Sequence, residues 1–278
     1  MISIALFGAG GKMGVRLATN LADSPYTVHH IEVSEAGRQR LLDETGLTCT
    51  TQADALADAD VVILAVPDRL IGTILDGFVD ELRPGTAVIM LDAAAPSAGK
   101  LPDRADLTYF VTHPCHPPIF NDETDPEAQT DYFGGYKAKQ NIICALMQGP
   151  EDHYELCEQI ARAFYAPVMT AHRCTVEQMI VLEPALSESV GATFSYMLRA
   201  AVDEATRRGV PEQAARDFLL GHLSILLAVS FDLQPGGRLS DGCMLAIEEA
   251  KPLIFHDDWL NRIFDPNAIT ASVESIVH

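Results

Sequence analysis

The first half of the chain alternates short apolar runs with segments of helical spacing. Parallel strands that are covered by helices on both faces read as near-continuous apolar runs, as VVILAV does here. The pattern therefore predicts an α/β fold built on a Rossmann-type, mostly parallel sheet with helices between the strands. The predicted strands are Ile2–Phe7, Val28–Val33, Val61–Val66, Ala87–Leu91, Leu107–Val111 and Ile142–Leu146.

The pattern changes after about Cys174, because no strand-like run follows it. Two long segments, Val176–Arg208 and Glu212–Leu233, carry helical spacing instead. We therefore expect an NAD-binding Rossmann domain over residues 1–174 and an all-helical domain for substrate binding and dimerisation over residues 175–278.

One of these helical segments, Leu219–Phe231 (LLGHLSILLAVSF), is apolar around much of its circumference. A helix of this kind is buried either in a domain core or in a subunit interface. The segment therefore favours a homo-oligomer, a homodimer or a larger assembly.

The net charge of the chain argues against nucleic acid and anionic membranes as partners. Its 278 residues include 19 Lys and Arg against 39 Asp and Glu, a formal net charge of −20. Such a field repels nucleic acid and anionic lipid, and no apolar run approaches the roughly 20 residues that span a bilayer. We expect a cytoplasmic protein with a small-molecule substrate. The six cysteines lack CxxC spacing, which favours reduced thiols.

A glycine-rich turn directly follows the first predicted strand and opens a helix over Val15–Ala22. This strand, turn and helix are the context of a dinucleotide-binding fingerprint, although tight turns use the same residues. The glycines would let the backbone approach a pyrophosphate at the helix N-terminus. They are Gly8, Gly10, Gly11 and Gly14, spaced as GxGxxxG or GxxGxxG.

Two further strand ends complete the predicted NAD site. Glu32 ends the second strand, 24 residues after Gly8, where an acidic residue accepts from ribose hydroxyls. Its charge favours NAD over NADP, while the nearby Arg38 and Arg40 weaken that preference. Val66 and Pro67 end the third strand at the expected switch point, where their backbone should contact the cofactor.

A His-Pro segment, THPCHPP, follows the strand Leu107–Val111 at the expected carboxyl edge of the sheet. Its prolines restrict the backbone and would hold His113 and His116 in place. An imidazole there can take the hydroxyl proton during oxidation or bind a metal ion. Inert loop histidines are the alternative.

Glu183 lies in the apolar stretch QMIVLEPAL, where a carboxylate must be paired, protonated or bound to a cation. Pro184 after it disrupts the helical hydrogen bonds, so we expect a kink or a helix start. A solvated helix acid is the alternative.

Other polar residues show no spacing that specifies a site. We expect the acidic run Asn121–Asp131 to be a solvated loop or a lid. The remaining candidates, which we expect mostly at the surface, are Asp92, Lys251, His256, Asp257 and Asp258.

Several of these motifs together resemble the 6-phosphogluconate dehydrogenase-like superfamily: GAGGKMG, VVILAVPD, the His-Pro segment and the helical second half. The words HPCHPPIFND, DYFGG, QGPEDHYE and VEQMIVLEPALSES are similar to those of bacterial sugar-acid oxidoisomerases within it. This resemblance implies NAD-dependent oxidation of the 2-hydroxyl of a branched acid, D-apionate. An α-ketol rearrangement to 3-oxo-isoapionate would follow, and a divalent metal ion is implied by analogy.

The resemblance also assigns roles to residues. Lys12 and Met13 would join the glycines and Glu32 in holding NAD. His116 would be the base, with His113 and Glu183 orienting substrate or binding metal, although the two histidines could exchange roles. The alternatives are a simple 2- or 3-hydroxy acid dehydrogenase, such as a prephenate dehydrogenase-like enzyme, and a non-catalytic NAD sensor.

Overall fold

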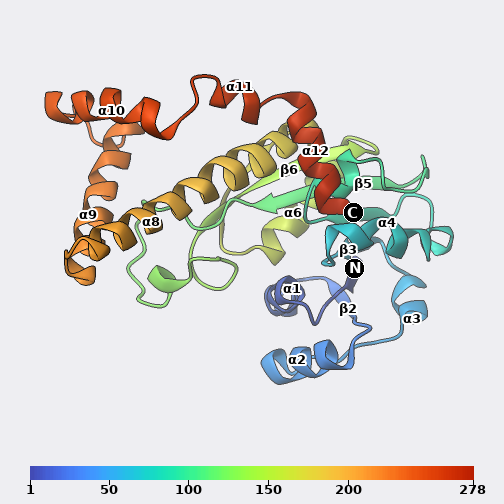
Figure 1. Ribbon diagram of the computed structural model, residues 1–278. Helices are drawn as coiled ribbons and strands as arrows, with labels where there is room; N and C mark the ends of the chain where they lie inside the picture. Colours follow the sequence, from blue (N-terminus) through green and yellow to red (C-terminus); the bar gives the residue numbers. More distant parts are fainter. The chain divides into compact units, whose positions relative to one another are not determined.

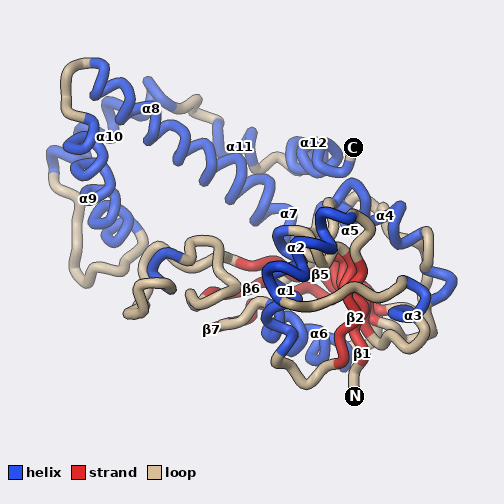
Figure 2. The backbone as a smooth tube through the Cα atoms, turned by 90° about the horizontal axis from the view of Figure 1, so that it is seen from below, coloured by secondary structure: helices blue, strands red, loops and turns tan.

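A computed structural model describes residues 1–278, and their backbone packing divides the chain into two compact units. We call residues 1–180 with 270–278 the sheet unit, and residues 181–269 the helical unit. In Figure 2 all strands belong to the first of these stretches, whereas the second consists of helices and loops. The predicted fold class is confirmed.

The sheet unit contains one seven-stranded sheet in the order β2-β1-β3-β4-β5-β6-β7. All neighbouring strands are parallel except β5 and β6, which are antiparallel. The strands are β1 (Ser3–Phe7), β2 (Thr27–Ile31), β3 (Val61–Leu64), β4 (Ala87–Met90), β5 (Thr108–Pro114), β6 (Gln140–Gln148) and β7 (Val168–Arg173).

Two of these strands differ from the sequence-based expectation. β7 was not predicted, because this edge strand (VMTAHR) exposes much of its surface and lacks an apolar run. β5 continues to Pro114, so His113 lies in a strand rather than in the loop after it. Antiparallel pairing with β6 extends β5, since His113 is opposite Ile143.

Helices cover both faces of the sheet (Figure 1). Residues of α1, α2 and α6 bury one face, and residues of α3, α4, α5, α7 and the end of α12 bury the other. The helices are α1 (Lys12–Ala22), α2 (Glu35–Thr45), α3 (Gln52–Leu56), α4 (Asp68–Asp76), α5 (Ala94–Ser97), α6 (Asp152–Phe164), α7 (Val176–Ile180) and α12 (Pro266–Val277), with 3-10 turns η1 (Val79–Glu81) and η2 (Ala128–Thr130).

The helical unit begins with an irregular stretch, η3 (Val181–Ala192), which has π-helical hydrogen bonding and contains Pro184. Proline removes a backbone donor, and π turns arise where the regular ladder is interrupted. The predicted disruption at Pro184 is confirmed. The other helices are α8 (Thr193–Arg207), α9 (Glu212–Ser230), α10 (Asp241–Ile254) and α11 (Trp259–Ile263).

Apolar side chains are exposed in the helical unit. Neither α9 nor α10 has a buried residue, and Phe218 on α9 is 70% exposed. Of the two settings predicted for Leu219–Phe231, a core within this chain is therefore wrong. No helix of the protein meets the length and hydropathy needed to cross a bilayer. All six cysteines are free thiols, as predicted.

Candidate active site

The glycine turn packs tightly between β1 and α1. Gly8 has a φ of +73°, and a Cβ atom there would lie 2.3 Å from the carbonyl oxygen of Ala65. A Cβ atom at Gly14 would lie 2.0 Å from the carbonyl oxygen of Gly8. Gly11 caps α1 without a side-chain acceptor for the helix N-terminus. This cradle of backbone, open to an acceptor at the first turn of α1, fits a bound pyrophosphate.

Glu32 directly follows β2 and reaches back to the glycine turn. Its carboxylate accepts from the backbone N–H of Gly10 (3.1 Å) and of Ser34 (2.9 Å). The two nearby arginines bind backbone: Arg38 donates to the Glu32 carbonyl (2.7 Å) and Arg40 to the Gly10 carbonyl (2.6 Å). This arrangement places a hydrogen-bond acceptor beside the turn, and both guanidinium groups are bound to backbone carbonyls. It agrees with the expected preference for NAD over NADP.

The end of β3 meets the same turn. A Cβ atom at Gly8 would lie 3.0 Å from a methyl carbon of Val66, and Pro67 caps α4. The next residue, Asp68, carries a polar side chain that the sequence analysis did not select. Burial raises its pKa to about 7, with a further contribution from the charge of Asp92. The sequence feature that could have identified Asp68 is its position directly after the strand that ends at the switch point.

His113 and Asp92 lie together at the carboxyl ends of β5 and β4. Nδ1 of His113 donates to the carbonyl oxygen of Leu91 (2.8 Å) and lies 3.7 Å from an oxygen of Asp92. Burial lowers the pKa of His113, and Asp92 opposes that shift. Asp92 also accepts from the N–H of Ala94 (2.7 Å), so the expectation that it is a surface residue was wrong. Strand adjacency, which sequence spacing does not show, brings it to His113.

His116 lies beyond β5 in a backbone conformation that L-residues rarely adopt, with a φ of +60°. Such a conformation costs about 1–3 kcal/mol and is commonest at functional sites. Nδ1 of His116 donates to the carbonyl oxygen of Phe133 (2.8 Å). A carbonyl only accepts, so the neutral imidazole carries its proton on Nδ1 and its lone pair on Nε2. Its ring centroid is 6.3 Å from that of His113.

Glu183 belongs to the helical unit, in η3, three residues beyond Ile180. Its role stays a prediction, as do the roles of the two histidines. The four other polar candidates of this unit are exposed, as expected: Lys251, His256, Asp257 and Asp258. The acidic run Asn121–Asp131 is mostly exposed and contains η2.

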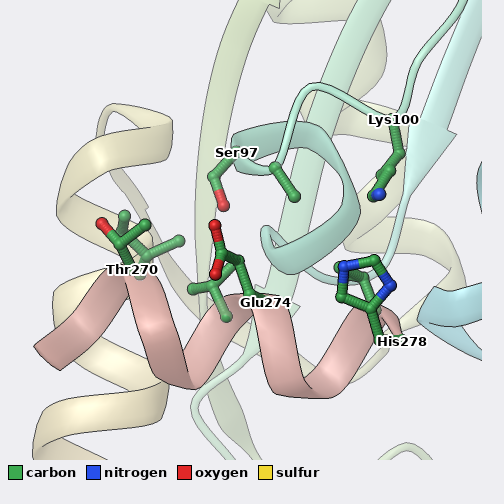
Figure 3. Close-up of a pocket in the computed structure, with 9 residues that line it drawn as sticks. Ser97, Lys100, Thr270, Glu274 and His278 are labelled. Carbon is green, nitrogen blue, oxygen red and sulfur yellow. The ribbon is translucent and has the colours of Figure 1, made fainter. Parts of the chain in front are cut away.

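A cavity of about 240 Å³ lies between α5 and the end of α12 (Figure 3). Ser97, Lys100, Glu274 and His278 give it polar walls, and apolar residues such as Ile180 complete it. None of the residues predicted for NAD, metal or catalysis lines this cavity. The histidine site at the sheet edge is therefore a separate feature of the sheet unit.

Two family models match the chain. Residues 3–101 match the NAD binding domain of 6-phosphogluconate dehydrogenase. Residues 121–277 match the C-terminal part of decarboxylating phosphogluconate dehydrogenase. The first match covers the glycine turn, Glu32 and Asp92, and the second covers Glu183 and the helical unit.

Individual proteins are similar over almost the whole chain. A D-apionate oxidoisomerase from Cupriavidus necator is 59% identical, covering 98% of each chain. One from Blautia hydrogenotrophica is 41% identical, covering 100% of this chain and 97% of its own. A crystal structure of a semialdehyde dehydrogenase NAD-binding protein from Cupriavidus necator, in complex with calcium and NAD, has a TM-score of 0.97 and 59% identity, covering 99% of each chain.

Proposed function

Because the chain belongs to the 6-phosphogluconate dehydrogenase family, we propose that it is an NAD-dependent oxidoisomerase that converts D-apionate to 3-oxo-isoapionate. The observation that carries the proposal is 59% identity, across both the NAD-binding and the helical part, to a D-apionate oxidoisomerase. The polar groups at the carboxyl edge of the sheet, Asp92 and His113, would supply proton-transfer and cation-binding groups for such a reaction.

The cofactor site uses the backbone of the glycine turn and its flanking strands. The turn of Gly8, Gly10, Gly11 and Gly14 would let the pyrophosphate approach the first turn of α1, and Glu32, which already accepts from the N–H of Gly10, would also accept from the ribose. Bound NAD supplies the acceptor for the hydride that leaves the substrate carbon. The remaining residues that we expect along the cofactor are Lys12, Met13, Val66 and Pro67.

His116 is the base in this proposal. Its Nδ1 donates to Phe133, so its Nε2 can take the proton from the substrate hydroxyl as the hydride leaves. The rearrangement needs two more proton movements: one proton leaves the tertiary hydroxyl and one returns to the oxygen formed at C2. Once His116 has passed on the first proton, the same Nε2 can carry this proton between the two oxygens, while His113, 6.3 Å away between ring centroids, orients the substrate or holds the cation proposed below.

We further propose that His113 binds a divalent cation, with Asp92 beside it in the sheet unit and with Glu183 as the further ligand that the sequence analysis predicts. The pair Asp92 and His113 is already assembled in the sheet unit. Glu183 follows Ile180, the last residue of the continuous part of the sheet unit, by three residues. Two carboxylates and one imidazole suit Mg²⁺ or Mn²⁺, and the 59% identical protein from Cupriavidus necator was crystallised with calcium. A bound cation would polarise the two substrate oxygens that change bonding.

The helical unit is proposed to form a homodimer with a second copy of the chain. α9 and α10 extend for 19 and 14 residues without a buried side chain, while Leu245 and Leu253 are 62% and 85% exposed. Apolar surface of this extent is typical of an interface. A second copy of the chain is the favoured partner, because it is present wherever the protein itself is present.

The test combines NADH formation with identification of the product. The protein is incubated with D-apionate, NAD and Mg²⁺ or Mn²⁺, NADH absorbance is followed, and the product is examined by carbon NMR. A rearranged 3-oxo skeleton supports the proposal. An unrearranged 2-keto acid would reduce the activity to that of a simple hydroxy acid dehydrogenase.

A loss-of-base variant separates an enzyme from an NAD sensor. His116→Ala should lower turnover by about 100-fold or more while NAD affinity is retained, because a general base contributes 10²–10⁴-fold. Absence of NADH with D-apionate and with other hydroxy acids, together with tight NAD binding, would favour the sensor.

A further inference from the structure

The segment Asp131–Ala138 (DYFGGYKA) forms a closed loop around one carboxylate. Asp131 accepts four backbone N–H groups: those of Gly134 (3.0 Å), Tyr136 (3.2 Å), Lys137 (2.9 Å) and Ala138 (3.2 Å). Burial raises the pKa of Asp131, but these hydrogen bonds outweigh it and the pKa is lowered. The ionised carboxylate therefore organises the loop.

One face of α1 holds this loop in place. Lys12, Arg16 and Asn20 are four residues apart and so lie on the same side of the helix. The ammonium of Lys12 lies 4.7 Å, and the guanidinium of Arg16 4.2 Å, from the ring centroid of Phe133. The amide of Asn20 donates to the carbonyl of Gly135 (2.9 Å). The loop is thus fastened to the helix that begins at the glycine turn.

Phe133 also contacts His116. Its carbonyl accepts from Nδ1 of His116 (2.8 Å), and the two ring centroids are 4.8 Å apart at an interplanar angle of 55°. His116 itself has a positive φ, so its backbone alone does not favour this orientation. Phe133 therefore contacts the imidazole with both its carbonyl and its ring, and contacts α1 with the same ring.

We propose that Asp131 and Phe133 are positioning residues, and that the loop Asp131–Ala138 fixes the tautomer and the orientation of His116 relative to the first turn of α1. This inference rests on the proposed role of His116 as the base. Asp131 shapes the loop, Phe133 presents the carbonyl, and the Nε2 lone pair of His116 is thereby directed away from Phe133. Neither residue exchanges a proton with the substrate.

The main test is the isosteric variant Asp131→Asn, which replaces an oxygen that accepts backbone N–H groups with a donor. We expect kcat with D-apionate to fall by about tenfold or more, since small misplacements of a catalytic group have effects up to about 100-fold. The Kd for NAD should stay within about twofold, because the glycine turn is unchanged. Asp43→Asn is the control: this exposed carboxylate on α2 accepts from the side-chain amide of Gln39 (2.7 Å), makes no contact with the loop and should leave kcat unchanged.

A second measurement needs no substrate. ¹⁵N NMR of the His116 imidazole should show the proton on Nδ1 in the parent protein and a shift toward the Nε2–H form in Asp131→Asn. An unchanged His116 signal in a folded Asp131→Asn protein would overturn the inference. If D-apionate is not turned over at all, this readout still decides the positioning role, so failure of the proposed function and failure of this inference are distinguishable.

Phe133→Leu is a milder variant that keeps the backbone carbonyl and removes the ring. It should lower kcat severalfold with little change in NAD affinity and should retain the Nδ1–H tautomer. Tyr132→Leu, at a neighbouring side chain that is 79% exposed, is its control. Equal kcat values for Phe133→Leu and Tyr132→Leu would overturn the part of the inference that concerns the ring.

Discussion

The sheet unit and the helical unit bury their apolar side chains in different ways. In the sheet unit, alternate strand residues such as Ile4 and Ala5 enter two different clusters, one on each face of the sheet. In the helical unit, which contributes to neither cluster, Phe218 and Phe231 are each 70% exposed. The sheet unit thus completes its core within one chain, whereas the helical unit leaves large apolar side chains exposed, and the proposed homodimer rests on this surface.

The largest expected effect lies in the core of the sheet unit. Phe110, on β5, is fully buried, so Phe110→Ala should cost about 3–5 kcal/mol of unfolding free energy. Denaturant unfolding measures this loss. A cost below that of an exposed-site substitution such as Phe231→Ala would contradict the proposed contrast between the units.

The glycine turn comes next. Gly14→Ala places a Cβ atom 2.0 Å from a backbone oxygen, so we expect a loss of about 1–3 kcal/mol of stability and NAD binding weakened by about tenfold or more. Calorimetry with NAD measures both. The control is Gly221→Ala in α9, where no atom lies within 4 Å of the added carbon and helix propensity favours alanine.

An exposed aromatic residue tests the helical unit. Phe218→Asp should weaken the dimer by about 1–2 kcal/mol, or roughly tenfold in its dissociation constant, while the monomer stays folded. Analytical ultracentrifugation over a range of concentrations gives the constant. Arg216→Ser, at a polar position of the same helix, is the control. A parent protein that is monomeric throughout that range would refute the proposed dimer.

The last test concerns the pH dependence of stability that Asp68 contributes. Because its folded pKa is raised to about 7 from 3.8, the folded state holds a proton that the unfolded chain has released. Stability from this group is complete below about pH 4 and is lost as the pH rises toward 7. Without divalent cations, Asp68→Asn should therefore be more stable relative to the parent at pH 8 than at pH 5. Urea unfolding at both values checks this, and a constant difference would refute it.

The sequence patterns that were confirmed depend on neighbours close along the chain. Six predicted strands form because continuous apolar runs are stable only between two layers of helices, and the glycine turn was visible because its residues are consecutive. The edge strand β7 was not predicted, because a strand in an exposed position does not need an apolar run. The proximity of Asp68 and Asp92 was not predicted, because the two residues follow different strands. Only the order of the strands in the sheet brings their carboxylates together.

The sequence by itself determined the fold class and the place of the glycine turn between β1 and α1, since both depend on local spacing and on the burial that this spacing dictates. Only the tertiary structure decided that Asp92 contacts His113, and that Phe133 holds His116 from 17 residues away. These contacts join segments distant in sequence, and their specificity comes from strand order and from a carboxylate-centred loop. Strand order and the loop around Asp131 leave no periodic pattern of hydrophobic and polar residues in the sequence, because contacts between distant segments define both of them.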